Sequence, residues 1–317
     1  MLKRLRLVLF AAALFSSPKP TLAADDGVPT DLSQHASRQV LPDPGEADCP
    51  NVPRGLEQVR GNLYRHTSGA GLAVHSGLVL ITPEGGLVID PALTCTARWL
   101  LAEIRRRFDV PVRYVVYTHA HADHIGGGQV FQQAGATVVA NRRAIEPIVG
   151  ERLPTALPDR VFDQDMTITL GGETVLLHRV APSHSDSMAM VLFPGYRALQ
   201  CTDVCESKSM PYNDFLDFYY DGWIETLDWV LAQDVDLIDV GHYTPATKAD
   251  EAALRNYLVD LHQQVLDLDR RGQTWDQLYR NVRFGDEVRQ WIAFDQMHIL
   301  NILGMHRWVS NHRRGLW

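Results

Sequence analysis

A short run of histidines directly after an apolar segment restricts this chain more than any other feature. Residues 113–117 are rich in Val and Tyr and predict a buried strand, and His119, His121, Asp123 and His124 follow it within seven positions. His119 and His121 are two apart, so in an extended segment both imidazoles leave the same side and can bind one cation. Asp123 and His124 then lie where the chain turns and can face a second position. The segment therefore predicts a metal site rather than an ordinary polar loop.

The composition indicates a globular protein and argues against nucleic acid as a partner. The chain has 317 residues, 45% of them hydrophobic, which is enough for one large domain or a domain with an extension. Its net charge of -8, with no basic block in the body of the chain, gives no long-range attraction for nucleic acid. We therefore expect a small-molecule substrate and no nucleic acid partner, and the oligomeric state stays open.

Residues 1–24 have the composition of a secretory signal peptide. Three basic residues precede an apolar run at residues 7–15, and small residues follow, which predicts cleavage after Ala23 or Ala24. A membrane anchor is the competing interpretation, but the apolar run is shorter than the ~20 residues that span a bilayer. We therefore expect a periplasmic or secreted protein without stable membrane insertion after cleavage.

Export would allow the four cysteines to form disulfides, and three pairings of Cys49, Cys95, Cys201 and Cys205 are possible. Cys201 and Cys205 flank Asp203 and can pair locally, which would leave Cys49 with Cys95. The alternative is that Cys201 is a small buried hydrophobic residue. The sequence does not choose between these pairings.

The remaining pattern predicts two sheets covered by helices. Residues 25–54 have no periodicity and predict an irregular N-terminal arm, residues 55–247 carry short apolar strands with helices between and after them, and residues 248–317 form a helical extension of the same domain. Thr274 is the predicted N-cap of a helix in that extension. The predicted hairpins join residues 78–81 with 87–90, 166–170 with 174–180, and 188–193 with 198–201.

Three further polar residues follow predicted strands, where loops collect functional groups. They are His184, Asp203 and His242. Together with the four residues of the histidine run, they make a set of imidazole and carboxylate ligands without a thiolate. Such a set suits zinc and also accepts iron or manganese.

In these residues the chain resembles the metallo-beta-lactamase fold superfamily, whose signature is H-x-H-x-D-H followed by a single His, a single Asp and a single His. Residues 119–124 match the first motif in full, Gly241 and His242 match the closing glycine-histidine pair, and Asp90 matches an early structural aspartate. The resemblance covers roughly residues 59–247. It implies an α+β fold, a four-layer αββα sandwich, here with an appended C-terminal helical region.

The resemblance also implies a ligand arrangement. One metal would be bound by His119, His121 and His184, a second by Asp123, His124 and His242, and Asp203 would bridge the two. By family frequency the cofactor is two Zn²⁺ per chain, although the ligands also accept iron or manganese.

The chain departs from the family pattern at several positions. Ser183 and Ser185 flank His184 where members often read G-H-T-P-G-D, Thr202 precedes Asp203 where Gly is usual, and Tyr243 replaces the glycine after His242. Asp203 itself stands where typical class B1 and B2 beta-lactamases have a zinc-binding cysteine, which argues against those two classes.

We therefore expect a dinuclear zinc hydrolase in which a metal-bridging hydroxide attacks an ester, thiolester, lactone or amide. Asp123 is assigned, by analogy only, a catalytic role as proton acceptor besides binding metal. The alternatives are an iron-dependent oxygenase or other redox member of the fold, a beta-lactamase, or a non-catalytic metal-binding partner of an exported redox system. Fold membership alone does not choose among them.

Tyr243, beside a predicted ligand, is the candidate substrate contact. For the aromatic residues after Asp203, a substrate pocket and a hydrophobic patch beneath the helical tail are both open, and their composition favours the patch. These residues are Tyr212, Tyr219, Tyr220 and Trp223. His75 begins a predicted strand and can reach the rim of the site, but it is not among the predicted ligands.

Overall fold

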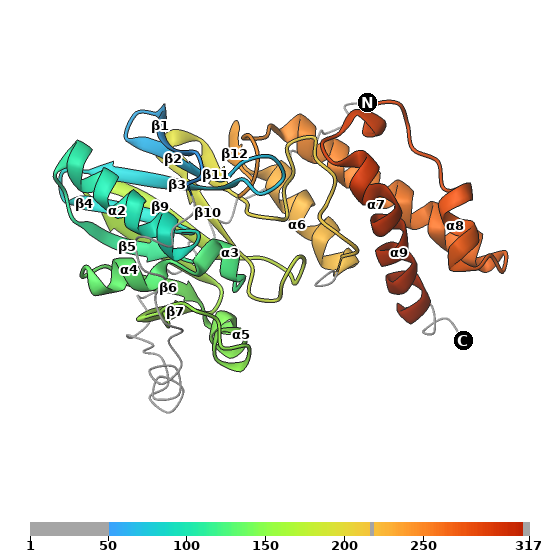
Figure 1. Ribbon diagram of the computed structural model, residues 1–317, viewed down its shortest axis with the longest axis horizontal. Coiled ribbons are helices and arrows are strands. Elements are labelled where there is room, and N and C mark those ends of the chain that lie inside the picture. The colour runs from blue at the N-terminus through green and yellow to red at the C-terminus, as the bar shows by residue number, and fades with distance from the viewer. Residues whose placement is uncertain (1–50, 216–218, 313–317) are drawn as a thin grey trace, which may run out of the picture.

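The computed structural model describes residues 51–215 and 219–312 (Figure 1). The expected signal peptide at residues 1–24 and nearly all of the expected arm at 25–54 therefore lie outside the described residues. The first strand begins at Arg54, where that arm was expected to end.

Two mixed sheets pack face to face at the centre of the fold (Figure 1). The larger sheet contains β1 (Arg54–Arg60), β2 (Leu63–Ser68), β3 (His75–Thr82), β4 (Gly85–Ile89), β5 (Val112–Val116), β6 (Thr137–Asn141) and β7 (Arg160–Phe162) in sequence order. Its pairs are antiparallel up to β4 and parallel from β4 onward. The smaller sheet has the order β12-β11-β10-β9-β8, and only its β11–β12 pair is parallel. Its strands are β8 (Asp165–Leu170), β9 (Glu173–Arg179), β10 (Ala189–Phe193), β11 (Ala198–Gln200) and β12 (Leu237–Asp239).

Helices cover the outer face of each sheet. The helices that follow β4, β5 and β6 are α2 (Thr94–Phe108), α3 (Ala122–Ile125), α4 (Gly128–Gln133) and α5 (Ile145–Gly150). The later helices, on the side of the smaller sheet, are α6 (Tyr220–Ala232), α7 (Lys248–Arg270), α8 (Trp275–Asn281) and α9 (Phe294–His312). Short 3₁₀ turns η2 (Arg142–Ala144), η3 (Pro194–Tyr196) and η4 (Val288–Gln290) complete the described chain. The predicted αββα sandwich with C-terminal helices is confirmed.

Successive apolar side chains of the central strands point to opposite faces of the sheet, and this explains why helices and a second sheet cover those faces. In β3, Leu78 and Leu80 point into the cluster between the two sheets, whereas Val79 and Ile81 point into the cluster beneath α2. Successive strand side chains leave opposite faces, so a strand buried on both faces must be apolar throughout. A third cluster packs Trp223 and Leu227 of α6 between the smaller sheet and the C-terminal helices.

Glycine determines the turn between β8 and β9. Gly171 and Gly172 have φ angles of +57° and +83°, a left-handed pair that suits a two-residue hairpin turn and that other residues adopt only with strain. The hairpin predicted across these two glycines is confirmed. The β3–β4 and β10–β11 hairpins also form as predicted.

The C-terminal helices support a loop that reaches the edge of the sandwich. A capping box at Thr247 begins α7, and Thr274 caps α8 as predicted. Tyr257 of α7 donates a hydrogen bond to Asn301 of α9 over 2.8 Å, and the Asn301 side-chain amide donates to the carbonyls of Pro211 and Asn213. The helical extension therefore holds the loop around residues 211–213 in place, and this loop borders the cavity described below.

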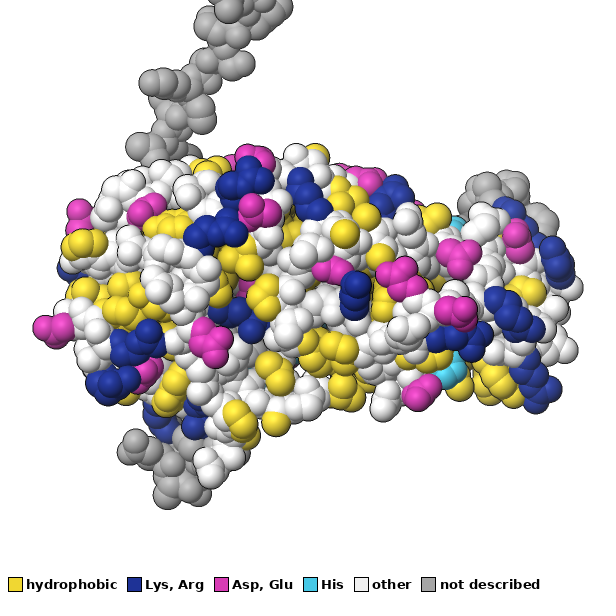
Figure 2. Space-filling model, turned by 90° about the horizontal axis from the view of Figure 1, so that it is seen from above, with side chains coloured by type: hydrophobic (Ala, Val, Ile, Leu, Met, Phe, Trp, Pro, Cys, Tyr) yellow, Lys and Arg dark blue, Asp and Glu magenta, His cyan; other side chains and the backbone are white. Residues whose placement is uncertain are grey.

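The surface seen in Figure 2 carries acidic and basic side chains intermixed, with no extended area of one sign. None of the helices in the described ranges has the length and apolar composition needed to cross a membrane.

Candidate metal centre

The predicted ligand residues all lie at the same edge of the sandwich because each follows the end of a strand. His119 and His121 lie in the segment after β5, and Asp123 and His124 lie in α3, whose first turn closes with a hydrogen bond from the His124 amide to the His121 carbonyl. The other three residues follow β9, β11 and β12 and are His184, Asp203 and His242. Loops after strands are the usual place for such groups, because rigid strands position them.

The first ligand group is compact. The Nδ1 atom of His121 lies 3.0 Å from Nε2 of His184, and Oδ2 of Asp203 lies 3.4 Å from Nε2 of both His119 and His184. One ligand atom from each of these four residues lies within 4.8 Å of the others. Ligands about 2.1 Å from a tetrahedral zinc ion lie about 3.4 Å apart, so this spacing fits a metal ion.

The second group shares Asp203 with the first. Oδ2 of Asp203 lies 3.0 Å from Nε2 of His124, and its Oδ1 lies 3.0 Å from Nε2 of His242. Asp203 has a left-handed backbone with φ of 61° and a side chain that is only 10% exposed. The carboxylate of Asp203 therefore faces both ligand groups at once.

Asp123 lies between the second group and a residue that was not predicted to be a ligand. Its Oδ2 atom is 3.3 Å from Nε2 of His124 and 3.2 Å from Nε2 of His75. His75, Asp123 and His242 form a third cluster whose ligand atoms lie within 4.8 Å of one another. The only signal for His75 in the sequence was its position at the start of β3.

Unpaired buried nitrogens support the presence of a metal. Within the described part of the chain, Nε2 of His119 and Nε2 of His124 are buried and lie 3.4 and 3.0 Å from Oδ2 of Asp203, but without the geometry of a hydrogen bond. Leaving a buried polar atom unpaired costs about 1–3 kcal/mol, so such atoms need a partner. Two imidazole nitrogens directed at one carboxylate are suited to a divalent cation.

Asp90 orients His119 through a neighbouring hydroxyl. The Thr118 hydroxyl donates to Oδ2 of Asp90 over 2.6 Å and lies 3.0 Å from Nδ1 of His119. Because the hydroxyl proton is already donated, Nδ1 of His119 must carry the proton of that contact, which leaves the Nε2 lone pair facing the site. Burial raises the pKa of Asp90 to about 6 despite the hydrogen bonds that it accepts. The predicted structural aspartate thus acts on a ligand.

The departure at Thr202 has a structural role. Its hydroxyl donates to Oδ2 of Asp90 over 2.9 Å and accepts a hydrogen bond from the Gln200 amide. Thr202 therefore ties the loop that carries Asp203 to Asp90, and Asp90 in turn contacts Thr118 beside His119; glycine has no side chain for this hydrogen bond.

A backbone carbonyl determines the tautomer of His242. Nδ1 of His242 lies 2.7 Å from the carbonyl oxygen of Val74, and a carbonyl can only accept, so Nδ1 donates and Nε2 faces Asp203. Behind it, Arg65 donates to Asp239 over 2.6 Å and to the Tyr243 carbonyl over 2.7 Å. This buried pair holds Tyr243, whose φ is 47°, in the left-handed backbone conformation.

The ionisation of the two ligand groups differs. Burial lowers the pKa of His119 to about 3, and His121 acts in the same direction. Burial also acts to lower the pKa of His124, but the carboxylates of Asp203 and Asp123 outweigh it and raise that pKa to about 10. His119 is therefore ready to bind a cation as a neutral ligand, whereas a cation at His124 must replace a proton.

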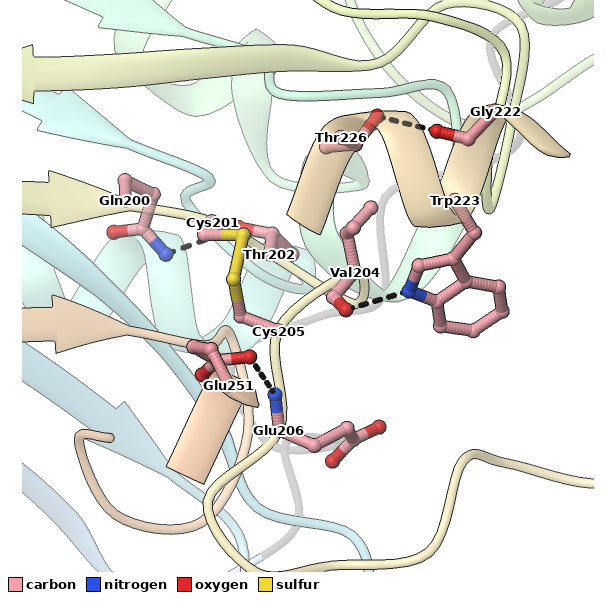
Figure 3. The surroundings of a disulfide bond; sticks show 10 residues. All are labelled: Gln200, Cys201, Thr202, Val204, Cys205, Glu206, Gly222, Trp223, Thr226 and Glu251. Atoms are coloured by element: carbon pink, nitrogen blue, oxygen red, sulfur yellow. Dashed lines mark hydrogen bonds between the residues drawn. A yellow bond between two sulfur atoms is a disulfide. The ribbon is translucent and has the colours of Figure 1, made fainter. Parts of the chain in front are cut away.

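A disulfide supports the Asp203 loop (Figure 3). Cys201 and Cys205 are bonded and buried, which agrees with the local pairing considered from the sequence, and the Trp223 indole donates to the carbonyl of Val204 over 2.7 Å. Cys95 is also disulfide-bonded, and Cys49 lies outside the described residues. Asp203 thus lies in a short loop whose two ends are joined to each other by the disulfide.

Two buried carboxyl groups lie just past the disulfide. The Glu206 amide donates to the Glu251 side chain over 3.3 Å, and the Ser209 hydroxyl donates to the Glu206 carboxyl. Figure 3 shows the Glu206 side chain directed away from Glu251. Burial raises the pKa of Glu206 to about 8 and that of Glu251 well above its ordinary value. Sequence reasoning missed Glu206, whose only signal was its position three residues after Asp203.

The ligand residues open into a cavity of about 450 Å³. Tyr243, Tyr212 and Trp223 line it. Trp223 is also buried in the cluster beneath the C-terminal helices, so the patch interpretation holds for its ring as well, whereas Tyr212 is exposed and belongs to the cavity. Tyr220 instead stacks on His262, with ring centroids 4.2 Å apart, and Tyr219 lines a neighbouring cavity. The cavity gives the ligand groups direct access to a bound molecule.

Fold and ligand arrangement define a class of protein, and a sequence comparison agrees. The model of the metallo-beta-lactamase superfamily matches residues 69–242, more than half of the chain, and the chain belongs to that superfamily. Its members and the relatives of this chain are metal-dependent hydrolases, so this is the enzyme class that the fold and the site define.

Individual relatives are distant. The alpha subunit of 2,4-dinitroanisole O-demethylase from Nocardioides sp. (strain JS1661) is 27% identical over 59% of this chain, and the match spans 57% of that subunit. A type 2 metallo-beta-lactamase from Bacillus cereus is 25% identical over 59% of this chain and 75% of its own length. Among solved structures, a double mutant of the sec-alkyl sulfatase PisA1 has a TM-score of 0.66 at 18% identity and covers 83% of this chain and 52% of the sulfatase, a likeness of fold.

Proposed function

We propose that this protein is a dinuclear metal hydrolase, with zinc as the expected metal, that cleaves an ester, thiolester, lactone or amide bond in a small molecule. The observation that carries the proposal is the position of the Asp203 carboxylate between two imidazole groups. Its Oδ2 lies 3.4 Å from His119 of the first group and 3.0 Å from His124 of the second, and its Oδ1 lies 3.0 Å from His242 of the second. His119, His121 and His184 would hold one cation, and His124, His242 and Asp123 the other. Divalent cations held there would supply an acidified water and polarise the scissile carbonyl.

The residues around the site have separate tasks in this reaction. Overall, the water oxygen bonds to the acyl carbon, the bond to the leaving atom breaks, and the remaining water proton goes to the leaving atom. Asp123 is the candidate for that proton transfer, because its side chain is 44% exposed and lines the cavity. Burial acts to raise the pKa of Asp123, but contact with His75 and the charge of His124 hold it below its ordinary value, so the carboxylate is ionised at neutral pH.

The relatives give the proposal a range of bonds to test. The Bacillus cereus relative is named as a beta-lactamase, and the Nocardioides relative is named for O-demethylation of an aromatic ether.

We also propose an exported location, supported by the composition of residues 1–24 and by the Cys201–Cys205 disulfide. Detection of the mature chain in the periplasmic or extracellular fraction would support this location.

Elemental analysis combined with turnover tests the proposal. The purified mature chain is assayed for zinc, iron and manganese, and for hydrolysis of lactone, thiolester, aryl ester and beta-lactam substrates with and without a chelator. About two zinc ions per chain with chelator-sensitive hydrolysis is the expected result. One iron per chain without hydrolysis would overturn the proposal and favour an oxygenase.

A further inference from the structure

The walls of the cavity above the ligand residues are apolar. Leu72 and Ala73 come from the loop before β3, Met210 and Phe215 from the loop before α6, and Trp223 from α6 itself. Tyr212 and Leu72 stand at the opening with exposed fractions of 74% and 46%. Large apolar side chains at an opening leave water when an apolar or aromatic group covers them, and this favours binding of such a group.

No lysine or arginine side chain lines this cavity among the described residues. Two arginines near its borders are already paired. Arg65 donates to Asp239 over 2.6 Å behind Tyr243, and Arg307 donates to Asp214 over 2.8 Å at the side of the neighbouring cavity. A carboxylate or sulfate on the part of a substrate remote from the ligand residues would therefore lose water without gaining a positive partner.

Apart from the imidazoles near the ligand groups, the ionisable side chains that line this cavity are acidic or tyrosine hydroxyls. Besides the ligand carboxylates, the cavity is lined by Glu206, which accepts from Ser209, and by Asn213. An ionised Glu206 repels an anion, and a protonated Glu206 offers a hydrogen bond without a charge. Neither state supplies the positive charge that an anionic substituent needs.

We propose that the substrate carries an uncharged aromatic or branched aliphatic group on the side remote from the scissile bond. This proposal rests on the function proposed above, because the ligand residues define which end of the substrate reacts. The remote group lies against Tyr212, Phe215 and Trp223, and the anionic analogue of the same compound is disfavoured. Specificity thus comes from the apolar walls, together with the absence of lysine and arginine from the described residues that line the cavity.

A matched pair of esters tests the proposal in the metal-loaded protein. Methyl 4-acetoxybenzoate and 4-acetoxybenzoate share the acetyl ester and differ at the remote end in charge and by one methyl group. For each compound, kcat/KM for release of acetate is divided by the rate of the same reaction with hydroxide. The neutral ester is expected to be preferred by about tenfold or more, the size of one unscreened charge interaction in a partly buried site. Equal turnover, or preference for the anion, would overturn the proposal.

Two variants that each add one positive charge, one at the cavity opening and one away from it, test where the remote group binds. Leu72→Lys puts a cation at the cavity, and the preference for the neutral ester should fall by about tenfold. Ile299→Lys adds the same charge on α9, at a side chain that is 41% exposed and does not line the cavity, and the preference should not change. If both variants prefer the neutral ester as strongly as the parent protein does, the remote group of the substrate does not bind near Leu72, and its proposed place in this cavity is wrong.

A binding measurement separates this proposal from the proposed function. Benzohydroxamic acids bind metal through the same end, so 4-(methoxycarbonyl)benzohydroxamic acid and 4-carboxybenzohydroxamic acid compare the remote group alone by calorimetry. If neither ester is hydrolysed but the neutral hydroxamate binds about tenfold more tightly, the hydrolase proposal fails and the substrate class stands. If esters are hydrolysed but the anionic hydroxamate binds as tightly as the neutral one, the hydrolase proposal stands and the proposed substrate class fails.

Discussion

Nε2 of His75 lies 3.2 Å from Oδ2 of Asp123, although the two residues belong to different strand-to-loop segments. His75 is brought there by an antiparallel bridge between its own backbone and that of His242. The Ser76 amide strengthens this bridge by donating to the Gly241 carbonyl over 2.7 Å. His75 therefore positions the one predicted ligand whose side chain is substantially exposed.

Replacing His75 should weaken the second metal position. His75→Phe keeps a ring but removes the contact with Asp123, and loss of such an outer partner typically lowers metal affinity by about 10–100-fold. Elemental analysis after dialysis and the visible spectrum of the cobalt-substituted protein measure the effect. His178→Phe is the control, because His178 contacts Asp165 at 2.7 Å on the other sheet. Equal metal retention in both variants would contradict the role.

The two aspartates of the site should behave differently. Asp203→Asn removes a negative charge from both ligand groups, so metal content should fall at both positions. Asp123→Asn should keep the first metal and lose turnover by about 10²–10⁴-fold, the usual contribution of a general acid or base. Metal content and kcat are measured on the same preparations. An Asp123→Asn variant that keeps both metals and full turnover would show that Asp123 is not the proton-transfer group.

Removal of the local disulfide should destabilise the protein moderately. The bonded cysteines are four residues apart, and closing so short a loop is worth about 2 kcal/mol in the chain-entropy account. Cys201→Ala combined with Cys205→Ala should lower the free energy of unfolding in urea by about that amount and should speed metal loss, because Asp203 lies within the loop. Unchanged unfolding and unchanged metal retention would show that hydrogen bonds alone hold Asp203.

The stability of the metal-free protein should fall as pH rises through the neutral range. Burial raises the pKa of Glu206 from an ordinary value of 4.5 to about 8, so the folded state binds this proton more tightly than the unfolded state. The resulting stabilisation is complete below pH 4.5 and is lost as pH rises through about 8. Unfolding in urea at pH 5 and pH 8.5 should differ by more than about 1 kcal/mol.

Glu206→Gln should reduce this pH dependence, because glutamine does not ionise. Glu251 and Asp90, whose pKa values are also raised by burial, change stability in the same direction, whereas the lowered pKa of His119 acts in the opposite direction below pH 6.5. The slope of the variant is therefore compared with that of the parent protein and not with zero. An identical slope in Glu206→Gln and the parent protein would place the titration in another group.

Local patterns in the sequence predicted most of the fold. Apolar runs predicted the central strands, Gly171 and Gly172 predicted a hairpin turn, and Thr274 predicted a helix start, because each depends on residues close together in the chain. Strand β2 was not predicted. It contains Arg65 and His66, whose burial makes sense only once Asp239 pairs with Arg65 and the Ile89 carbonyl contacts His66.

The sequence by itself predicted the candidate metal ligands but not the other residues of the site. Seven ligand residues were predicted because each follows an apolar strand and because their order matches a known motif. Tertiary structure alone decided that His75 joins Asp123, that Thr202 connects Asp203 to Asp90, and that Glu206 and Tyr212 line the cavity. Local sequence preferences act over a few residues, whereas these contacts depend on how two sheets and the C-terminal helices pack together.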